Sequence, residues 1–402
     1  MGLVGYDGAK FSVPDDVEIP YIDGDGIGPD IMKAALRVFD ACIKNVYDAR
    51  RSVSWVRLEA GEEALSKTGS YVPDVTIDEI RRHRVAIKGP LTTPVGKGIR
   101  SINVMLRKKF DLYANIRPVR YLPGLPSPLK DPNGIDITIF RENTEDVYAG
   151  IEFASGSEAA KSLIDFMDEK LGVKIADGAG IGIKVMTEAA SKRIMRSALD
   201  YALSHGKDRV TIMHKGNIMK FTEGAFMQWC YEVARETLGQ RLITEQEVTE
   251  FHGGSVPSGR VLVNDRIADN MFQQVITRPR DYSVVVTPNL NGDYLSDAVA
   301  AEIGGLGVAP GANVGNEYAI FEAVHGSAPK YANKNIANPT SLILAGAMLF
   351  EHLGWTEAHG AIYGAIEKTV RAGIITQDLA RELGSASVGT AEFADAVIRN
   401  LQ

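Results

Sequence analysis

Short apolar runs alternate with amphipathic helical patterns along this chain, and this alternation constrains the fold more than any other feature. Residues 17–22 form an apolar run, and apolar positions recur at helical spacing from Ile31 to Phe39 after the loop at residues 23–28. Further runs of strand character lie at residues 84–88, 135–140 and 282–287. Strands that alternate repeatedly with helices predict an α/β fold with much parallel sheet.

Size and composition narrow the class of protein. The chain has 402 residues with 45% hydrophobic content, which favours two or three packed domains. A formal net charge of −7 argues against nucleic acid as the main partner but permits a local basic pocket for an anionic ligand. Cys42 and Cys230 lack the spacing of a zinc site or a disulfide framework, and no run approaches the ~20 apolar residues of a membrane span. We expect a cytoplasmic protein that binds neither nucleic acid nor membrane.

Glycine and proline clusters indicate the loops. The proline-rich residues 120–130 predict a domain crossing or a surface loop, and the glycine-rich residues 304–315 predict a flexible or tightly turned segment. The loop at residues 23–28 has a GxGxG pattern, whereas a dinucleotide-binding Rossmann loop has GxGxxG. We interpret it as a tight turn between strand and helix that needs positive φ.

Two carboxylates four residues apart indicate a cation site. Asp293 and Asp297 follow an Asn-Gly turn, and on a helix they would share one face that can hold a divalent cation. Asp293 can instead be a helix N-cap, whereas Asp297 would lie a full turn inside the helix. Asp269 either completes a three-carboxylate site or lies on a solvated helix face.

A polar stretch with several arginines indicates an anionic substrate. Residues 91–107 carry hydroxyls, an amide and arginines, and Arg117 and Arg141 follow in segments of strand character. Arginine pairs bidentately with carboxylates, so several converging arginines would select a di- or tricarboxylate. Each arginine alone can equally be a surface charge or an ion-pair partner.

A tyrosine and a lysine are candidates for proton transfer. Tyr148 follows a strand within an acidic, amide-rich loop, and Lys215 lies in a largely apolar frame where desolvation would lower its pKa. The alternatives are a core tyrosine, a surface ammonium and, for the adjacent His214, a hydrogen-bonded histidine at a strand end.

Six stretches, in order, match the motifs of one enzyme family. They lie at residues 21–28, 87–96, 139–146, 214–226, 289–293 and 325–331. The chain thereby resembles the isocitrate dehydrogenases of the prokaryotic homodimeric type, within the isocitrate/isopropylmalate dehydrogenase family, from about Ile19 to the C-terminus. The resemblance implies that family's two-domain α/β fold with a clasp, which is not a Rossmann fold. The implied units are a large domain (residues 1–112 and 304–402), a small α/β domain (113–145 and 189–303) and a dimer clasp (146–188).

The resemblance also implies a site and a reaction. Isocitrate would be oxidised and decarboxylated to 2-oxoglutarate through oxalosuccinate, with NADP and Mg²⁺ or Mn²⁺, as in the tricarboxylic acid cycle. The implied catalytic residues are Tyr148 and Lys215. The implied substrate contacts are Ser101, Asn103, Arg107, Arg117 and Arg141, and the implied metal ligands are Asp269, Asp293 and Asp297. Lys215 and Asp269 would reach into the partner's site, so that a homodimer shares its active sites.

Cofactor choice is implied by a further set of residues. Lys330 and Tyr331 match the pair with which NADP-using members meet the 2′-phosphate, and Arg381 matches another phosphate contact. Gln377 departs from the Tyr of the best-known NADP pattern, although an amide still donates a hydrogen bond, so use of both NADP and NAD remains open. The remaining implied cofactor contacts are Thr92, His325, Gly326, Ser327, Ala328, Pro329, Asn338 and Asp378.

Three alternatives remain. The nearest is an isopropylmalate- or homoisocitrate-type dehydrogenase, although an isopropylmalate enzyme would present apolar character at Ser101 and Asn103. A non-catalytic anion-binding protein would not need Tyr148, Lys215 and the aspartates together. An RNA-binding activity fits the acidic composition poorly.

Overall fold

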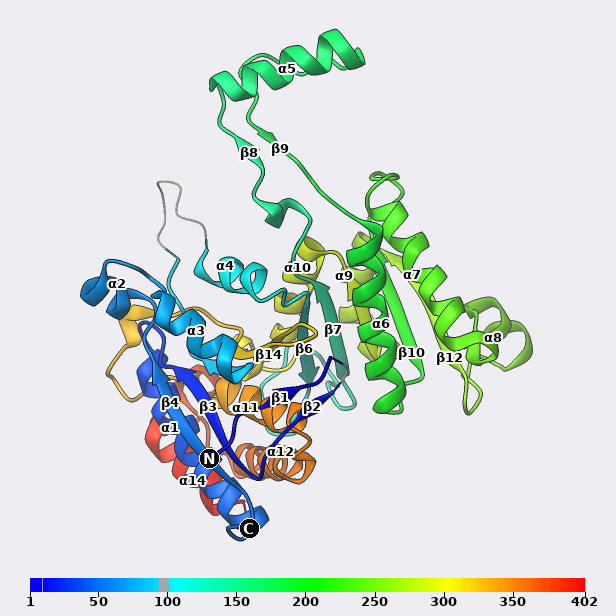
Figure 1. The fold of residues 1–402 in the computed structure, drawn as a ribbon. Coiled ribbons are helices and arrows are strands. Elements are labelled where there is room, and N and C mark those ends of the chain that lie inside the picture. The colour runs from blue at the N-terminus through cyan, green and yellow to red at the C-terminus, as the bar shows by residue number, and fades with distance from the viewer. Residues whose placement is uncertain (9, 94–100, 402) are drawn as a thin grey trace.

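One mixed sheet runs through the molecule in the computed structural model, which describes residues 1–8, 10–93 and 101–401 (Figure 1). The end of the motif at residues 87–96 therefore lies outside the described residues. The eleven strands, in spatial order, are β11 (Leu242–Ile243), β12 (Val261–Ile267), β10 (Arg209–His214), β13 (Val284–Thr287), β7 (Asp136–Glu142), β6 (Ala114–Arg120), β14 (Pro310–Val314), β15 (Ala319–Ala323), β5 (Val85–Lys88), β3 (Asp16–Ile22) and β4 (Ser52–Leu58).

The pairing confirms the predicted α/β class. The pairs β7–β6, β6–β14 and β14–β15 at the centre of the sheet are antiparallel, and the pairs on both sides of them are parallel. The strands expected at residues 17–22, 84–88, 135–140 and 282–287 are β3, β5, β7 and β13.

Helices cover the two halves of the sheet in separate groups (Figure 1). One group contains α1 (Gly28–Tyr47), α11 (Thr340–His352), α12 (Thr356–Arg371) and α14 (Thr390–Arg399), and the other contains α6 (Glu188–Ser204) and α7 (Glu223–Leu238). Because α11 is apolar nearly all round, it is buried from Thr340 to Phe350 against β14 and β15. The other helices are α2 (Glu62–Thr68), α3 (Asp74–His83), α4 (Ile102–Lys109), α5 (Glu158–Leu171), α8 (Glu245–Phe251), α9 (Ala268–Thr277), α10 (Asn289–Ala301) and α13 (Gln377–Leu383).

Two large apolar clusters stabilise these groups. The first unites α1, α11, α12 and α14 with the strands between them, and Phe39 meets Phe350 edge to face at 5.6 Å between ring centroids. The second lies between α6, α7 and the strands β10 and β13. The first cluster thus joins both ends of the chain, while the second is built from its middle. The predicted domain boundaries remain a prediction.

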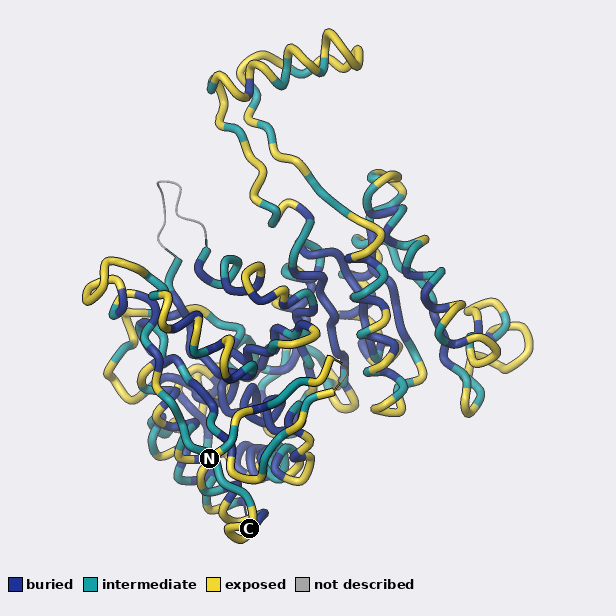
Figure 2. Tube along the Cα trace, viewed as in Figure 1, coloured by how far each residue is buried: buried dark blue, intermediate teal, exposed yellow. Residues whose placement is uncertain are grey.

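An arm projects from the body where the sequence predicts the clasp at residues 146–188 (Figure 1). It consists of the strand pair β8 (Glu152–Phe153) and β9 (Ile181–Gly182), with α5 at its tip. The helix α5 is exposed along most of its length (Figure 2), and the side chain of Phe166 is 50% exposed. Apolar side chains on a projecting helix favour a protein partner, but the interlocking of two subunits stays a prediction.

Two loop interpretations meet different outcomes. Residues 120–130 leave the end of β6 as an irregular loop, in which the Ser127 hydroxyl donates a hydrogen bond to the carbonyl oxygen of Glu302. The expectation of a flexible or tightly turned segment at residues 304–315 is wrong for its second half, because residues 310–314 form the buried strand β14. A short hairpin of β1 (Gly5–Tyr6) and β2 (Phe11–Ser12) precedes the main sheet.

The cysteines lie in the interior of the protein. Cys42 and Cys230 are both buried free thiols, and burial raises the pKa of Cys42 to about 12. Among the helices that the structure describes, not one combines the length and apolar character that a membrane span requires.

The buried carboxyl group of Glu302, just after α10, should make the stability of the folded protein depend on pH. Its side chain is 2% exposed, neither carboxylate oxygen has a hydrogen-bond partner in the described residues, and burial raises its pKa from 4.5 to about 8. A carboxyl group whose pKa is raised by folding stabilises the folded state. This stabilisation is complete at pH values below the pKa of the unfolded state, and it is lost as the pH rises towards the pKa of the folded state. We expect the free energy of unfolding to fall between pH 5 and 8 by up to about 1.4 kcal/mol per pH unit.

Urea unfolding at pH 5, 6.5 and 8 measures this slope. Glu302→Gln should flatten the profile, because the amide is neutral throughout. The exposed Glu169→Gln on α5 should leave the profile unchanged. An equal slope in Glu302→Gln and the wild type would show that another group is responsible.

Candidate functional site

The helix α10 presents the two carboxylates predicted for a cation. It begins at Asn289 after Pro288, so Asp293 and Asp297 lie inside it, one turn apart. The interpretation of Asp293 as an N-cap is therefore wrong, and Asn291–Gly292 is part of the helix and not a turn. A Cβ at Gly292 would lie 2.2 Å from the hydroxyl oxygen of Thr287, which explains the glycine by close approach.

Asp293 is the centre of a cluster that joins two sheet strands and the base of the arm. Arg141 of β7 donates to its Oδ1, and the Tyr148 hydroxyl donates to its Oδ2 at 2.7 Å. Arg117 of β6 lies 3.8 Å from Asp293 Oδ1 and donates to Asp297 at 3.3 Å. The Arg141 guanidinium also lies 4.9 Å from the centroid of the Tyr148 ring. Tyr148 is half-buried in this cluster and is not a core residue.

The surroundings shift the pKa values of Asp293, Asp297 and Tyr148 in different directions. Burial would raise the pKa of Asp293, but Arg141, the Tyr148 hydrogen bond and Arg117 hold it below its usual value. Burial raises the pKa of Asp297 despite Arg117. Burial and the bond to Asp293 raise the pKa of Tyr148, so its phenol stays protonated at neutral pH. The cluster therefore combines an ionised carboxylate with a phenol that keeps its proton.

Polar groups without partners indicate an anionic ligand. Within the described residues, no hydrogen bond is made by Arg107 Nε, Arg117 Nε, Arg141 Nη2 or the buried amide oxygen of Asn103. Burial lowers the pKa of Arg141 to about 10, which leaves the guanidinium charged at neutral pH. Buried polar groups normally find partners, so the three guanidinium donors favour a ligand with carboxylates.

A buried ionic network behind these arginines escapes sequence reasoning. Glu322 of β15 pairs with Lys88 at 2.6 Å and with Arg107 at 3.1 Å, and it accepts from Asn313 at 2.7 Å. Burial alone would raise the pKa of Glu322, but the two cations hold it well below its usual range. The only sequence signal was a single charge within each of two apolar strands.

Three of the five predicted substrate residues meet the predicted cofactor loop at a small cavity. Its volume is about 120 Å³, and its walls include Asn103, Arg107, Arg117, His325 and Gly326. Ser101 precedes α4 and accepts a hydrogen bond from the Thr93 hydroxyl at 3.3 Å. The structure thus brings α4, β6 and the loop at residues 325–331 together.

A larger cavity of about 510 Å³ gathers most of the predicted cofactor residues. Those lining it are His325, Gly326, Ala328, Tyr331, Asn338, Gln377, Asp378 and Arg381. Ile27, Ile336 and Ala337 add apolar walls that sequence reasoning missed. An apolar cleft with a few polar groups suits a nucleoside.

The remaining cofactor candidates lie beside this cavity. The hydroxyls of Thr92 and Ser327 are hydrogen-bonded at 2.8 Å, and Pro329–Tyr331 form one short turn. Lys330 Nζ lies 4.7 Å from the centroid of the Tyr331 ring. The exposed Arg381 contacts Glu382 at 3.1 Å.

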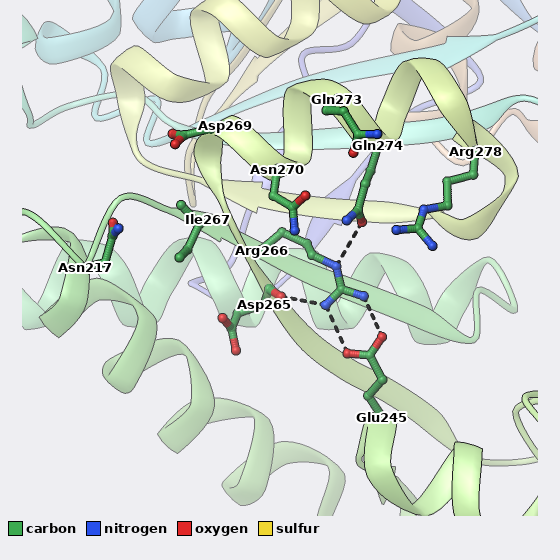
Figure 3. A pocket seen from close by; sticks show the side chains of 10 residues that line it. All are labelled: Asn217, Glu245, Asp265, Arg266, Ile267, Asp269, Asn270, Gln273, Gln274 and Arg278. Atoms are coloured by element: carbon green, nitrogen blue, oxygen red, sulfur yellow. Dashed lines mark hydrogen bonds and ion pairs between the residues drawn. The ribbon is translucent and has the colours of Figure 1, made fainter.

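Lys215 and Asp269 form a pair of their own. Lys215 Nζ donates to Asp269 Oδ2 at 2.5 Å, and Asp269 is 71% exposed at a cavity of about 790 Å³ (Figure 3). Within the described residues, no group of three potential ligands is assembled for a metal, so Asp269 does not join Asp293 and Asp297 in one chain. His214 donates to Asp265 from Nε2 and accepts from Gly216 at Nδ1, which confirms it as a hydrogen-bonded strand-end histidine.

Glu223 links this segment to α10 and was also missed. Its fully buried carboxylate accepts from the backbone N–H of Lys215 at 2.5 Å and from the Asn291 amide at 2.8 Å. Lys184, which follows β9 at the base of the arm, forms ion pairs with both Glu223 and Asp146. The backbone that carries Lys215 is thereby held against the helix that carries the aspartates.

The residues present fit a divalent cation and a nucleotide cofactor. Asp293 and Asp297 supply the oxygen ligands that Mg²⁺ and Mn²⁺ prefer, one turn apart on a helix. Among the described residues, one chain brings two such carboxylates together here, so a third would have to come from elsewhere. The 510 Å³ cavity, with Tyr331 and Arg381 at its wall, suits a nucleotide that carries a phosphate.

Comparisons with known proteins agree with this geometry. The family model described as isocitrate/isopropylmalate dehydrogenase matches residues 18–397. Isocitrate dehydrogenase (NADP) of Archaeoglobus fulgidus is 54% identical over 99% of this chain and 96% of that relative, and its namesake from Haloferax volcanii is 52% identical over 98% and 94%. The crystal structure of isocitrate dehydrogenase from Methylococcus capsulatus aligns with a TM-score of 0.79 at 40% identity, covering 96% of this chain and 99% of that one. The chain belongs to the isocitrate/isopropylmalate dehydrogenase family.

Proposed function

We propose that this protein catalyses the oxidative decarboxylation of isocitrate to 2-oxoglutarate and CO₂ with reduction of NADP⁺, through oxalosuccinate. The observation that carries the proposal is the Asp293 cluster, in which an ionised carboxylate, a protonated phenol and two buried arginines meet. One of these arginines, Arg117, also lines the 120 Å³ cavity, whose walls share His325 and Gly326 with the cofactor cavity. Relatives named isocitrate dehydrogenase (NADP), at 54% and 52% identity, support the choice of substrate and cofactor.

The arginines bind and orient the substrate. Arg107, Arg117 and Arg141 keep N–H groups without partners in the described residues, and these would pair with the carboxylates of isocitrate. Ser101 and Asn103 at the start of α4 would meet the third carboxylate. Glu322, itself paired with Lys88, holds Arg107 from behind, so the site is shaped before substrate binds.

The Lys215–Asp269 pair and Tyr148 would move protons at two different steps. Lys215 and Asp269, supplied by a second copy of the chain, would remove the proton of the C2 hydroxyl while C2 is oxidised. After the β-carboxylate leaves, Tyr148 would deliver its proton to C3, for which its raised pKa keeps it protonated. Asp293 holds the Tyr148 hydroxyl at 2.7 Å and so orients the donor.

Asp293 and Asp297, with Asp269 of the second copy, would hold Mg²⁺ or Mn²⁺. When bound there, the cation lowers the pKa of the substrate hydroxyl and stabilises the negative charge that develops on its oxygen. The projecting arm at residues 146–188 and the separate Lys215–Asp269 pair support a homodimer with shared sites. The two free thiols, Cys42 and Cys230, fit a cytoplasmic location.

The cofactor cavity supports NADP. Lys330 and Arg381 are exposed cations beside Tyr331, and together they would pair with the 2′-phosphate. Gln377 lines the same cavity and adds an amide donor, which leaves room for weaker use of NAD⁺.

Reduction of NADP⁺ and NAD⁺ at 340 nm with isocitrate tests the proposal. We expect turnover with Mg²⁺, a preference for NADP⁺ and no turnover after EDTA treatment, with recovery on adding Mn²⁺. Isopropylmalate should be a poor substrate, because the polar Ser101 and Asn103 replace an apolar surface. Turnover of isopropylmalate alone would refute the substrate, and turnover with NAD⁺ alone would refute the cofactor.

A further inference from the structure

The GxGxG loop at residues 23–28 is packed between two other loops. A Cβ at Gly24 would lie 2.4 Å from the carbonyl oxygen of Pro90, and one at Gly26 would lie 2.0 Å from that of Ser327. The Asp25 N–H donates to the Pro90 carbonyl at 2.7 Å, and the Ile27 N–H donates to the Ser327 carbonyl at 2.8 Å. Because both approaches need glycine, contact between loops accounts for the glycines of this motif.

The Asp25 carboxylate completes this junction from inside. Asp25 is only 5% exposed. Its Oδ1 accepts a hydrogen bond from the Glu62 N–H at 2.8 Å, and its Oδ2 accepts one from the Thr92 N–H at 2.7 Å. Gly61 leaves room for it, since a Cβ there would lie 2.3 Å from Asp25 Oδ1. A buried carboxylate with one backbone donor on each oxygen fixes both donors in direction and distance.

The Thr92 side chain extends the connection to the cofactor loop. Its hydroxyl is hydrogen-bonded to the Ser327 hydroxyl at 2.8 Å, and Ser327 is 8% exposed between two residues that line the 510 Å³ cavity, Gly326 and Ala328. Ile27, two residues after Asp25, lines the same cavity. The chain of contacts Asp25–Thr92–Ser327 therefore ends at the cofactor cavity.

We propose that Asp25 is a positioning residue for the cofactor site, which acts through Thr92 on the loop that carries Ser327. This inference rests on the proposed function and adds a residue outside its predicted contacts. Asp25→Asn would turn an –NH₂ group towards one of the two N–H donors, so that one hydrogen bond is lost and two donors face each other. Thr92 or the residues around Gly61 must then shift.

The test compares Asp25→Asn with Asp23→Asn in the same loop. Asp23 is the matched control because its carboxylate pairs with the exposed Arg57 and accepts no hydrogen bond from the described residues 89–93 or 325–331. We expect Asp25→Asn to raise the Kd for NADP⁺, measured by titration calorimetry without isocitrate, by about tenfold. The KM for NADP⁺ should rise in parallel, and the KM for isocitrate should change by less than about threefold.

A double-mutant cycle separates positioning from a general loss of stability. If Asp25 acts through the Thr92–Ser327 contact, Asp25→Asn and Ser327→Ala together should weaken NADP⁺ binding by less than the product of their single effects. Multiplicative effects, or a lowered Tm with an unchanged Kd, would overturn the proposal. If Asp25→Asn does not fold, the Kd for NADP⁺ is measured in Thr92→Val and in Ser327→Ala instead. A wild-type Kd in both variants would equally overturn the proposal.

The proposal and the proposed function fail differently. A wild-type protein that neither binds NADP⁺ nor oxidises isocitrate refutes the function before any variant is made. A fully active wild type with an unaltered Kd in Asp25→Asn refutes only the positioning role.

Discussion

Tyr148→Phe should lower kcat for isocitrate by about 10²–10⁴-fold, the range of general acid catalysis. In the proposed mechanism the phenol protonates C3, and burial with the Asp293 hydrogen bond raises its pKa so that it keeps its proton. The aromatic ring and its contact with the Arg141 guanidinium remain in the variant. The KM for isocitrate should therefore stay within about threefold of wild type.

Steady-state assays with saturating Mg²⁺ and NADP⁺ check this loss. Tyr294→Phe is the matched control, because Tyr294 lies on α10 beside Asp293 but is 59% exposed. It should retain wild-type kcat. The loss of one hydrogen bond in Tyr148→Phe should cost about 1 kcal/mol of stability, so the protein remains folded. A kcat within tenfold of wild type would exclude Tyr148 as the acid.

Local patterns predict the strands well. Four predicted strands, β3, β5, β7 and β13, are short and largely buried. Each can be recognised from the apolar residues of its own segment, without knowledge of distant contacts. The turn interpretation of the GxGxG loop also holds, since Gly24 and Gly26 both have positive φ. The sequence alone could not show what lies against these glycines.

Interpretations that depend on distant residues are less successful. Asn291–Gly292 resembles a turn, yet it lies in α10, and its glycine reflects the close approach of Thr287 and not a turn. Residues 310–314 contain a glycine but form β14, because neighbours on both sides supply hydrogen bonds. Tertiary contacts override local propensity at both places.

Buried charges are the hardest to predict. Glu322 is one charge in an apolar strand, and its partner Arg107 lies 215 residues away in the chain. Glu223, in the same way, reads as an ordinary first-turn residue of α7. A single sequence without contacts gives no means to pair them, although each fixes a residue of the candidate site.

A mixture of Lys215→Met and Tyr148→Phe subunits should recover activity that neither variant has alone. Lys215 pairs with Asp269 and makes no direct hydrogen bond or ion pair to the Asp293 cluster in the described residues, which supports its use by a second copy. In a mixed dimer, one site would receive a wild-type Tyr148 and a wild-type Lys215. Random pairing of equal amounts should then give about a quarter of wild-type turnover.

A second mixture shows whether recovery has this cause. Tyr148 and Asp293 are hydrogen-bonded within one chain, so Tyr148→Phe mixed with Asp293→Asn should leave every site with one defect and restore nothing. Co-expression with two purification tags isolates both mixed dimers for the NADP⁺ assay. Recovery in the first mixture but not in the second follows only if Lys215 serves the site of the other subunit. Inactivity of both mixed dimers would place Lys215 in the site of its own chain and remove the requirement for a shared site.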